Sequence, residues 1–206
     1  MSILMRIARA LSLTKDEATI VIVGLDDSGK SSIINHLKMA KQGKGGVKGA
    51  GFEATPTVGF QEEKFSASNI NFSVFDMSGQ SRYRNLWESY YRDADAIIFV
   101  VDSSDRLRVC VAKEELDNMM SHEDFQKTNI PLLVFANKMD ISGALSAEQC
   151  VEELEMDKIV ERPWQLVSSN GVTGVGLDVG VAWLSDSIKP TIRRRHSSLP
   201  GRNSRK

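Results

Sequence analysis

The sequence predicts an α/β fold, with a mostly parallel sheet of six strands flanked by helices on both faces. Runs of apolar and β-branched residues, each of strand length, alternate along the chain with stretches that read as helices. A glycine-rich turn joins the first such run to the first helical stretch. The length of 206 residues favours a single domain that can bury a sizeable core.

Apolar runs and turn residues give the order of the elements. The expected strands are residues 18–23, 57–65, 70–76, 96–101, 131–136 and 164–167. The expected helices are residues 31–38, 83–91, 107–120, 147–154 and 177–188. Only the turn residues Ser66–Asn69 separate the second strand from the third, which predicts an antiparallel hairpin. Residues 41–51, rich in glycine and lysine, cannot pack a core and predict a mobile loop.

The turn after the first strand fits the phosphate-binding pattern G-x-x-x-x-G-K-[ST] at every required position, from Gly24 to Ser31. Its backbone N–H groups point at one spot, and the following helix adds the partial positive charge of its N-terminus. Lys30 is expected to reach the β- and γ-phosphates, and the Ser31 hydroxyl to bind Mg²⁺. The other nucleotide-binding residues predicted here are Gly24, Leu25, Asp26, Asp27, Ser28, Gly29 and Ser32. A chance glycine-rich turn is the alternative, which the flanking strand and helix disfavour.

A second motif, D-x-x-G-Q, follows the third strand at residues 76–80. Asp76 is suited to hold Mg²⁺ through a water molecule, and the N–H group of Gly79 can approach a γ-phosphate. Gln80 can orient an attacking water, so Gln80 and Lys30 are the predicted catalytic residues. Asp-x-x-Gly alone is a common turn, and its place after an apolar strand makes it informative.

The fifth expected strand leads into an N-K-x-D motif formed by Asn137, Lys138 and Asp140. A carboxylate such as that of Asp140 can accept hydrogen bonds from the two adjacent N–H donors on the edge of guanine, a pattern that adenine lacks. Asn137 can bond the edge of the ring, and the stem of Lys138 can cover the base. These residues predict selection of guanine nucleotides, and a plain surface turn is the alternative.

With these motifs the chain resembles the small GTPases of the Arf/Arl (ADP-ribosylation factor and Arf-like) family over residues 3–188, which implies the P-loop NTPase fold of small G-proteins. The stretches that carry the resemblance are residues 24–26, 56–60 and 86–91. Residues 76–80, 82–87 and 102–108 are most similar to the sixth Arf-like subtype, which is linked to cilia and the Bardet–Biedl coat complex.

The resemblance implies roles for further residues. Thr57, in the first switch (residues 56–60), would sense Mg²⁺ and the γ-phosphate, so the implied metal ligands are Ser31, Thr57 and, through water, Asp76. The backbone N–H group of Ser168 would contact the guanine carbonyl oxygen. An aromatic cluster would either face effectors in the GTP state or simply belong to the core. Its members are Phe60, Phe75 and Tyr90.

The resemblance also implies a function. The cofactors would be GTP or GDP and Mg²⁺, with slow hydrolysis and recruitment of effectors to membranes. The partners would be a guanine-nucleotide exchange factor, a GTPase-activating protein and an effector or coat complex, with a Bardet–Biedl type coat suspected. The protein is expected to be a monomer with no nucleic-acid partner, cytoplasmic, in reversible contact with membranes and near the base of a cilium or flagellum. Two alternatives are a nucleotide-binding scaffold with negligible GTPase activity and an ATP-dependent enzyme, against which the N-K-x-D motif argues.

The chain departs from the family pattern at several positions. Ser78 replaces the glycine that most Arf proteins have before the glycine of the second switch (residues 76–80). Asp26 would lie beside the phosphates, where an acidic side chain suits slow unaided hydrolysis. Position 2 is serine, so N-myristoylation of the usual Arf kind is not expected.

The predicted divisions are an amphipathic helix at 1–14, a GTPase domain at 15–189 and a basic, disordered tail at 190–206. In the first segment Ile3, Leu4, Ile7, Ala8 and Leu11 share the apolar face of a helix, with Arg6 and Arg9 opposite. Such a helix can lie on a membrane or pack in a groove of the same protein. The two cysteines, Cys110 and Cys150, are expected to be reduced thiols.

Overall fold

The computed structural model describes residues 15–41 and 56–197, and the described strands form one sheet of six strands. The strands are β1 (Asp16–Val23), β2 (Phe60–Ala67), β3 (Ile70–Met77), β4 (Ala96–Asp102), β5 (Leu132–Asn137) and β6 (Trp164–Ser168). Their order across the sheet is β2-β3-β1-β4-β5-β6. All neighbours are parallel except β2 and β3, which pair antiparallel with Phe60 opposite Met77. The predicted mostly parallel sheet and its hairpin are confirmed.

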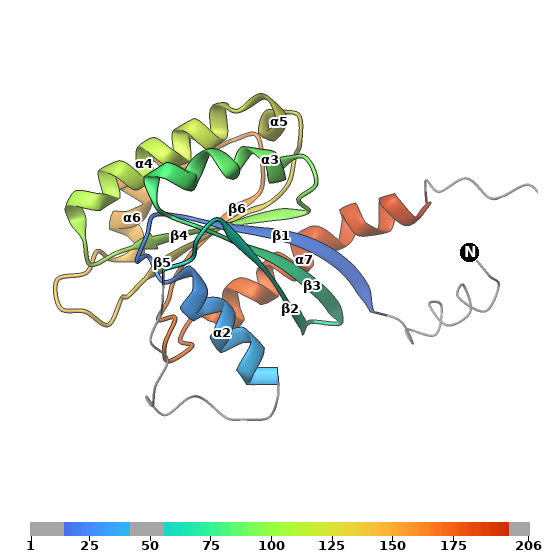
Figure 1. Cartoon of the computed structure of the whole chain (residues 1–206), viewed down its shortest axis with the longest axis horizontal. Coiled ribbons are helices and arrows are strands. Elements are labelled where there is room, and N and C mark those ends of the chain that lie inside the picture. Colours follow the sequence, from blue (N-terminus) through green and yellow to red (C-terminus); the bar gives the residue numbers. More distant parts are fainter. Residues whose placement is uncertain (1–14, 42–55, 198–206) are drawn as a thin grey trace, which may run out of the picture.

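Helices cover both faces of the sheet, as predicted (Figure 1). The α-helices are α2 (Lys30–Lys41), α3 (Glu88–Tyr91), α4 (Arg106–Ser121), α5 (Glu123–Gln126), α6 (Ala147–Glu153) and α7 (Leu177–Ser197). Two 3₁₀ helices, η1 (Ser81–Leu86) and η2 (Met156–Lys158), complete the set among the described residues. Helices α2 and α7 pack on one face, and α3, α4, α5 and α6 pack on the other.

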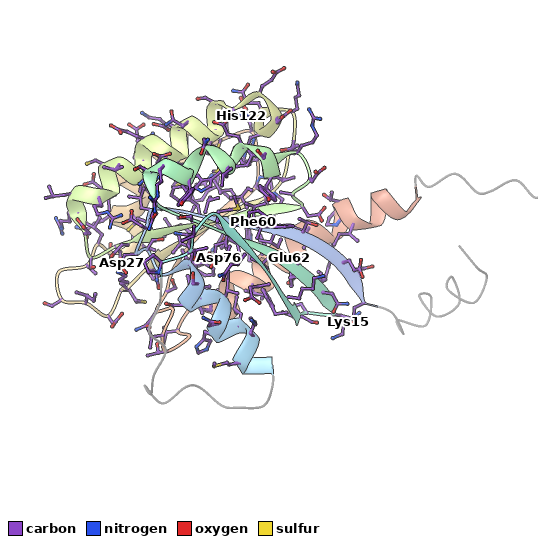
Figure 2. All side chains as sticks on the ribbon, viewed as in Figure 1. Lys15, Asp27, Phe60, Glu62, Asp76 and His122 are labelled. Carbon is purple, nitrogen blue, oxygen red and sulfur yellow. The ribbon has the colours of Figure 1, made fainter. Side chains whose placement is uncertain are left out.

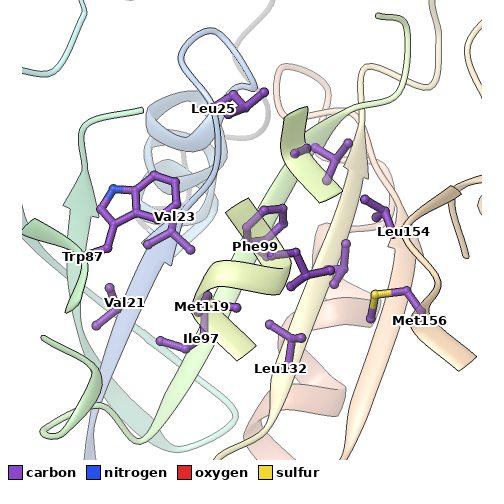
Figure 3. Close-up of a cluster of buried hydrophobic side chains, with 14 of the residues drawn as sticks. Val21, Val23, Leu25, Trp87, Ile97, Phe99, Met119, Leu132, Leu154 and Met156 are labelled. Carbon is purple, nitrogen blue, oxygen red and sulfur yellow. The ribbon is translucent and has the colours of Figure 1, made fainter. Parts of the chain in front are cut away.

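The core consists of two apolar layers, one on each side of the sheet. Successive side chains of a strand point to opposite faces, so in β1 Val21 and Val23 join one layer, and Ile20 and Ile22 join the other. Figure 3 shows the first layer, where Val23 lies near Trp87 from the segment after β3. This packing fixes the carboxyl ends of the strands, where the site residues begin.

Several expected boundaries were wrong, including the end of the first helix, which was expected at Lys38 and lies at Lys41. Thr57 was expected to open the second strand, but β2 begins at Phe60, because Gly59 has a φ of 72°, outside the range of extended backbone. The helix expected at 83–91 is divided into η1 and α3. The last helix was expected to end at Ile188, but α7 continues past Pro190, and the fully buried side chain of Ile192 packs it against the core.

Several predictions lie outside the described residues: the amphipathic helix at 1–14, most of the loop at 41–51 and the end of the tail after residue 197. Within 190–197, part of the predicted tail continues α7. None of the described helices combines the length and the apolar character that crossing a membrane requires. Cys110 is exposed and Cys150 is buried, and both are free thiols.

Candidate active site

The phosphate loop runs from the end of β1 into α2, where the sequence placed it. Gly24 has a φ of 138°, and a Cβ atom there would lie 2.2 Å from the carbonyl oxygen of Val100. Only glycine fits this conformation and this contact. The side chain of Leu25 is buried in the core, so Leu25 can offer a nucleotide only its backbone. The loop is therefore held closely against the sheet.

Lys30 is buried and its Nζ donates to the carbonyl oxygens of Gly24 and Leu25, at 2.9 and 2.7 Å. Burial lowers the pKa of Lys30 to about 8, and the nearby carboxylates of Asp76 and Asp26 oppose this shift. A phosphate group would stabilise the charged amine further. Lys30 is thus positioned as an anion-binding group.

Three side chains whose oxygen atoms can bind a metal ion come from separate segments and meet beside Lys30. The Oγ of Ser31 donates to Oδ2 of Asp76 at 2.5 Å and lies 3.2 Å from Oγ1 of Thr57. The other carboxylate oxygen of Asp76, Oδ1, is buried and has no hydrogen-bond partner. Burial raises the pKa of Asp76. A buried carboxylate with an unsatisfied oxygen and two hydroxyls is a donor set that fits Mg²⁺, a cation that binds oxygen and keeps part of its water.

The second switch packs directly on the phosphate loop. A Cβ atom on Gly79 would lie 2.2 Å from the backbone nitrogen of Asp26, so glycine is required here. Ser78 is buried, its N–H donates to the carbonyl oxygen of Gly59 at 2.9 Å, and its own carbonyl accepts from the indole of Trp87. The backbone of Ser78 therefore joins the second switch to the first. The sequence marked Ser78 only as a departure from the family pattern and did not predict this contact.

The side chain of Gln80 lies at the surface beside this junction. Its Oε1 accepts hydrogen bonds from Nε and Nη2 of Arg82, at 3.2 and 3.0 Å. The backbone N–H of Gln80 donates to Oγ of Ser78 at 3.4 Å. The structure therefore places the predicted water-orienting residue next to the phosphate loop but engaged with an arginine.

The base-recognition motif follows β5. Asn137 is buried, and Lys138 has a φ of 62°. The Nζ of Lys138 lies 2.7 Å from Asp102 and 3.2 Å from Asp27 of the phosphate loop. Burial disfavours the charged amine, but these carboxylates outweigh it and raise the pKa of Lys138. Asp140 is exposed, so its carboxylate is accessible to a base.

Ser168, predicted to contact the guanine oxygen, is the last residue of β6 and pairs with Ala136. The residues after it reach Asn137: Gly171 N–H donates to Asn137 Oδ1 at 2.8 Å, and Ser169 Oγ donates to the same atom at 3.3 Å. Sequence reasoning gave no role to Ser169 or Gly171, because the guanine-contact pattern of this segment is degenerate. The role of Ser168 stays a prediction.

A cavity of about 270 Å³ joins the phosphate and switch residues. Its walls are Asp26, Asp27, Gly29, Lys30, Ser31, Ser32, Pro56, Thr57, Ser78, Gly79 and Gln80. In Figure 2 the labelled side chains of Asp27 and Asp76 lie at the end of the sheet near the start of α2. The structure thus brings together the predicted phosphate, metal and catalytic residues, and places Asn137 directly behind them through its bond to Ser28.

The three predicted effector-facing aromatics form one cluster beside this cavity. The ring centroids of Phe60 and Tyr90 are 5.2 Å apart, and those of Phe75 and Tyr90 are 4.9 Å apart. Phe60 is 45% exposed, whereas Phe75 and Tyr90 are half-buried. The cluster is therefore both a packed unit and an exposed surface.

Two arginines near the phosphate loop were also missed by sequence reasoning. Arg84 in η1 bonds the carbonyl oxygen of Gly79 and the carboxylate of Glu115, and Arg108 in α4 bonds Asp26. Neither arginine belongs to a phosphate or base motif. Their contacts join residues that are distant in the sequence.

A site of this kind belongs to a small GTPase, a protein that binds GTP or GDP with Mg²⁺ and hydrolyses GTP. The N-K-x-D residues at the end of β5 stay the predicted determinants of guanine specificity, and the oxygen atoms around Ser31 stay the predicted metal ligands. The chain belongs to the ADP-ribosylation factor family, which it matches over residues 4–188. The predicted family is confirmed.

Relatives support the predicted subtype. The chain is 48% identical over 184 residues to ADP-ribosylation factor-like protein 6 of Danio rerio, covering 89% of this chain and 95% of that protein. It is 40% identical over 185 residues to the protein of the same name in Caenorhabditis elegans, covering 90% and 94%. A solved structure of the Arl6 BBS3 small GTPase from Trypanosoma brucei, with the bound nucleotide analogue GppNp, superposes with a TM-score of 0.74 at 40% identity. That match covers 84% of this chain and 98% of the other.

Proposed function

We propose that this GTPase is a switch that recruits effector or coat proteins to membranes in ciliary trafficking. The observation that carries the proposal is that two short segments connect the metal site to an exposed aromatic surface. Thr57 lies beside Ser31, and Phe60 of the same switch belongs to the ring cluster. Asp76 bonds Ser31, and the preceding residue, Phe75, belongs to the same cluster. A change at the γ-phosphate can therefore alter a surface that a partner protein contacts.

In the proposed mechanism, hydrolysis depends on charge stabilisation and one oriented water, without a covalent intermediate. Lys30 and the N–H groups of the phosphate loop stabilise the charge that develops on the transferred phosphoryl group. Ser31, Thr57 and, through water, Asp76 would hold Mg²⁺, which would add further positive charge beside the phosphates. Gln80 orients the attacking water once its amide is released from Arg82.

We propose that residues 1–14 attach the protein to membranes in a nucleotide-dependent manner. A cavity of about 560 Å³ lies near the start of β1, and β1, α2, β2 and β3 line it. Its walls combine the apolar side chains of Ala18 and Phe72 with the charged side chains of Lys38 and Lys64. A movement of the β2–β3 hairpin would change the shape of this cavity. Residues 1–14, which precede β1, would respond to that change.

The proposed partners follow from the family and from its named relatives. Small GTPases of this family act with exchange factors, activating proteins and effectors. The similar structure from Trypanosoma brucei carries both the Arl6 and the BBS3 names. We infer a Bardet–Biedl type coat as the effector, a location at the base of a cilium or flagellum, and a monomeric switch. A scaffold without useful hydrolysis is the weaker alternative, because Lys30 and Gln80 both lie at the cavity.

Binding of a purified Bardet–Biedl coat to the immobilised protein tests this function. The protein loaded with GppNp should bind the coat, and the protein loaded with GDP should not. Phe60→Ala should remove the binding, whereas Val160→Ala, another exposed apolar residue that lies outside the ring cluster, should leave it unchanged. Equal binding of the GppNp and GDP forms would contradict the proposal.

A further inference from the structure

The phosphate loop carries an acidic side chain at the cavity where it should bind an anion. Asp26 lines the 270 Å³ cavity together with Lys30 and Gly79, and its side chain is 51% exposed. A carboxylate at this position repels a phosphate group, because like charges that share a site disfavour one another. The repulsion is greatest for the nucleotide that carries an additional phosphate. The site therefore needs a nearby positive charge to offset Asp26.

Arg108 supplies such a charge from the first turn of α4. Its Nη2 lies 2.7 Å from Oδ1 of Asp26 and 2.8 Å from the Asp26 backbone carbonyl oxygen. Asp105 caps the same turn, since its Oδ1 accepts the backbone N–H of Arg108 at 3.1 Å. The cap fixes the start of the helix and so the position from which Arg108 reaches the phosphate loop.

A second arginine approaches the same carboxylate from the second switch. The Nη2 of Arg84 lies 3.8 Å from Oδ1 of Asp26. The other guanidinium nitrogens of Arg84 bond the carbonyl oxygen of Gly79 at 2.9 Å and Oε1 of Glu115 at 2.7 Å. Besides burial, the positive charges of Arg84 and Arg108 lower the pKa of Lys30, so both arginines interact electrostatically with the phosphate-binding amine. Glu115 engages Arg84, whereas Arg108 makes its hydrogen bonds to the phosphate loop directly.

We propose that Arg108 is a specificity-determining residue that offsets the charge of Asp26 and thereby allows the site to accept a γ-phosphate. This inference rests on the proposed switch function and on the expectation from the sequence that Asp26 lies beside the phosphates of the bound nucleotide. Arg108 touches the phosphate loop and acts through it. Its loss should therefore weaken binding of a nucleoside triphosphate more than binding of a diphosphate.

Equilibrium titration of the nucleotide-free protein with GppNp and with GDP, both with Mg²⁺, tests the proposal. Arg108→Gln should weaken GppNp by about tenfold and GDP by less than about threefold, as expected for a partly exposed charge near the additional phosphate. Arg108→Lys keeps the charge and should preserve the preference. Arg106→Gln is the matched control, because Arg106 is an exposed arginine in the same helical turn, and neither affinity should change.

A double-mutant comparison separates this role from a merely structural one. In an Asp26→Asn background, where there is no carboxylate to offset, Arg108→Gln should have no selective effect on GppNp. An equal loss of GppNp and GDP affinity in Arg108→Gln, or the same selective loss in the Asp26→Asn background, would overturn the inference. If the unmodified protein failed to bind GppNp, the proposed switch function itself would be wrong. This result differs from those that would contradict only the role of Arg108.

Discussion

The Nδ2 atom of Asn137 donates a hydrogen bond to the backbone carbonyl oxygen of Ser28 at 2.8 Å, joining the base-recognition motif to the phosphate loop across 109 positions of the chain. Its Oδ1 atom accepts the N–H group of Gly171 at 2.8 Å. One buried amide thus holds together three loops, which lie at the carboxyl ends of β1, β5 and β6. We infer that Asn137 supports the geometry of the whole site in addition to any contact with a base.

Asn137→Ala should therefore weaken both the fold and nucleotide binding. The change leaves the carbonyl oxygen of Ser28 and the N–H of Gly171 without their buried partner, which typically costs about 1–3 kcal/mol of unfolding free energy. Denaturant unfolding of the nucleotide-free protein measures this loss, and dissociation of a fluorescent GDP should be faster. Asn118→Ala, on the exposed side of α4, is the control and should change neither quantity. Unfolding curves that coincide for the wild type and Asn137→Ala would contradict the structural role.

A change at Asp140 tests base selection. Asp140→Asn should weaken GTP and GDP and improve binding of xanthine nucleotides, because an amide complements the carbonyl that xanthine has in place of the amino group of guanine. The exposed position of Asp140 means that the fold should tolerate the change. Competitive titration with guanine, xanthine and adenine nucleotides measures the shift. Equal affinity of the unmodified protein for ATP and GTP would remove Asp140 from this role.

The pKa of about 8 for Lys30 predicts how nucleotide binding depends on pH. A bound phosphate favours the protonated amine and so raises its pKa above that of the nucleotide-free site. The affinity for nucleotide should have its full value below pH 8. Above pH 8 it should fall by up to about tenfold per pH unit, until the pKa of Lys30 in the nucleotide-bound protein is reached. Titrations with GDP at several pH values measure this. Lys30→Arg keeps its charge throughout, so a fall of the same size in that variant would assign the effect to another group.

The sequence predicted the components of the site because each follows a strand and carries its own local motif. The segments beginning at Gly24, Asp76 and Asn137 lie at the carboxyl ends of β1, β3 and β5, where a parallel sheet brings ligand-binding residues together. They lie at the same end of the sheet because β1, β3 and β5 run in the same direction. The contacts of Arg108 with Asp26 were not predictable, because they join residues 82 positions apart through side chains that no motif marks.

Boundaries were less predictable than the elements themselves, for local and for tertiary reasons. Gly59 turns the backbone to a positive φ, so Thr57 reaches Ser31 from a loop and not from the expected strand. Pro190 predicts the end of a helix, since proline lacks the N–H that continues it. Burial of Ile192 outweighs that local signal, because packing against the core stabilises the additional turns of α7.

A substitution at Gln80 separates nucleotide binding from hydrolysis. Gln80→Leu should retain GTP binding and lose the hydrolysis that an activating protein stimulates, because leucine cannot hold a water molecule. Single-turnover hydrolysis, with and without an activating protein, measures both properties. Gln61→Leu, an exposed residue at the start of β2, is the control and should hydrolyse GTP normally. Unchanged stimulated hydrolysis in Gln80→Leu would assign the water-orienting role to a different residue.

The last prediction concerns membranes. Attachment should depend on the apolar face that includes Ile3 and Ile7, aided by the basic side chains of the N-terminal segment and the tail. The GTP form should bind anionic liposomes and the GDP form should not, and added salt should weaken binding because exposed charges are screened beyond about 8 Å at physiological ionic strength. Ile3→Glu with Ile7→Glu should abolish binding, whereas deletion of residues 198–206, which leaves the buried Ile192 in place, should only reduce it. Liposome sedimentation in both nucleotide states measures this, and equal binding of the two forms would leave a simple attachment through the basic tail in place of a nucleotide-controlled helix.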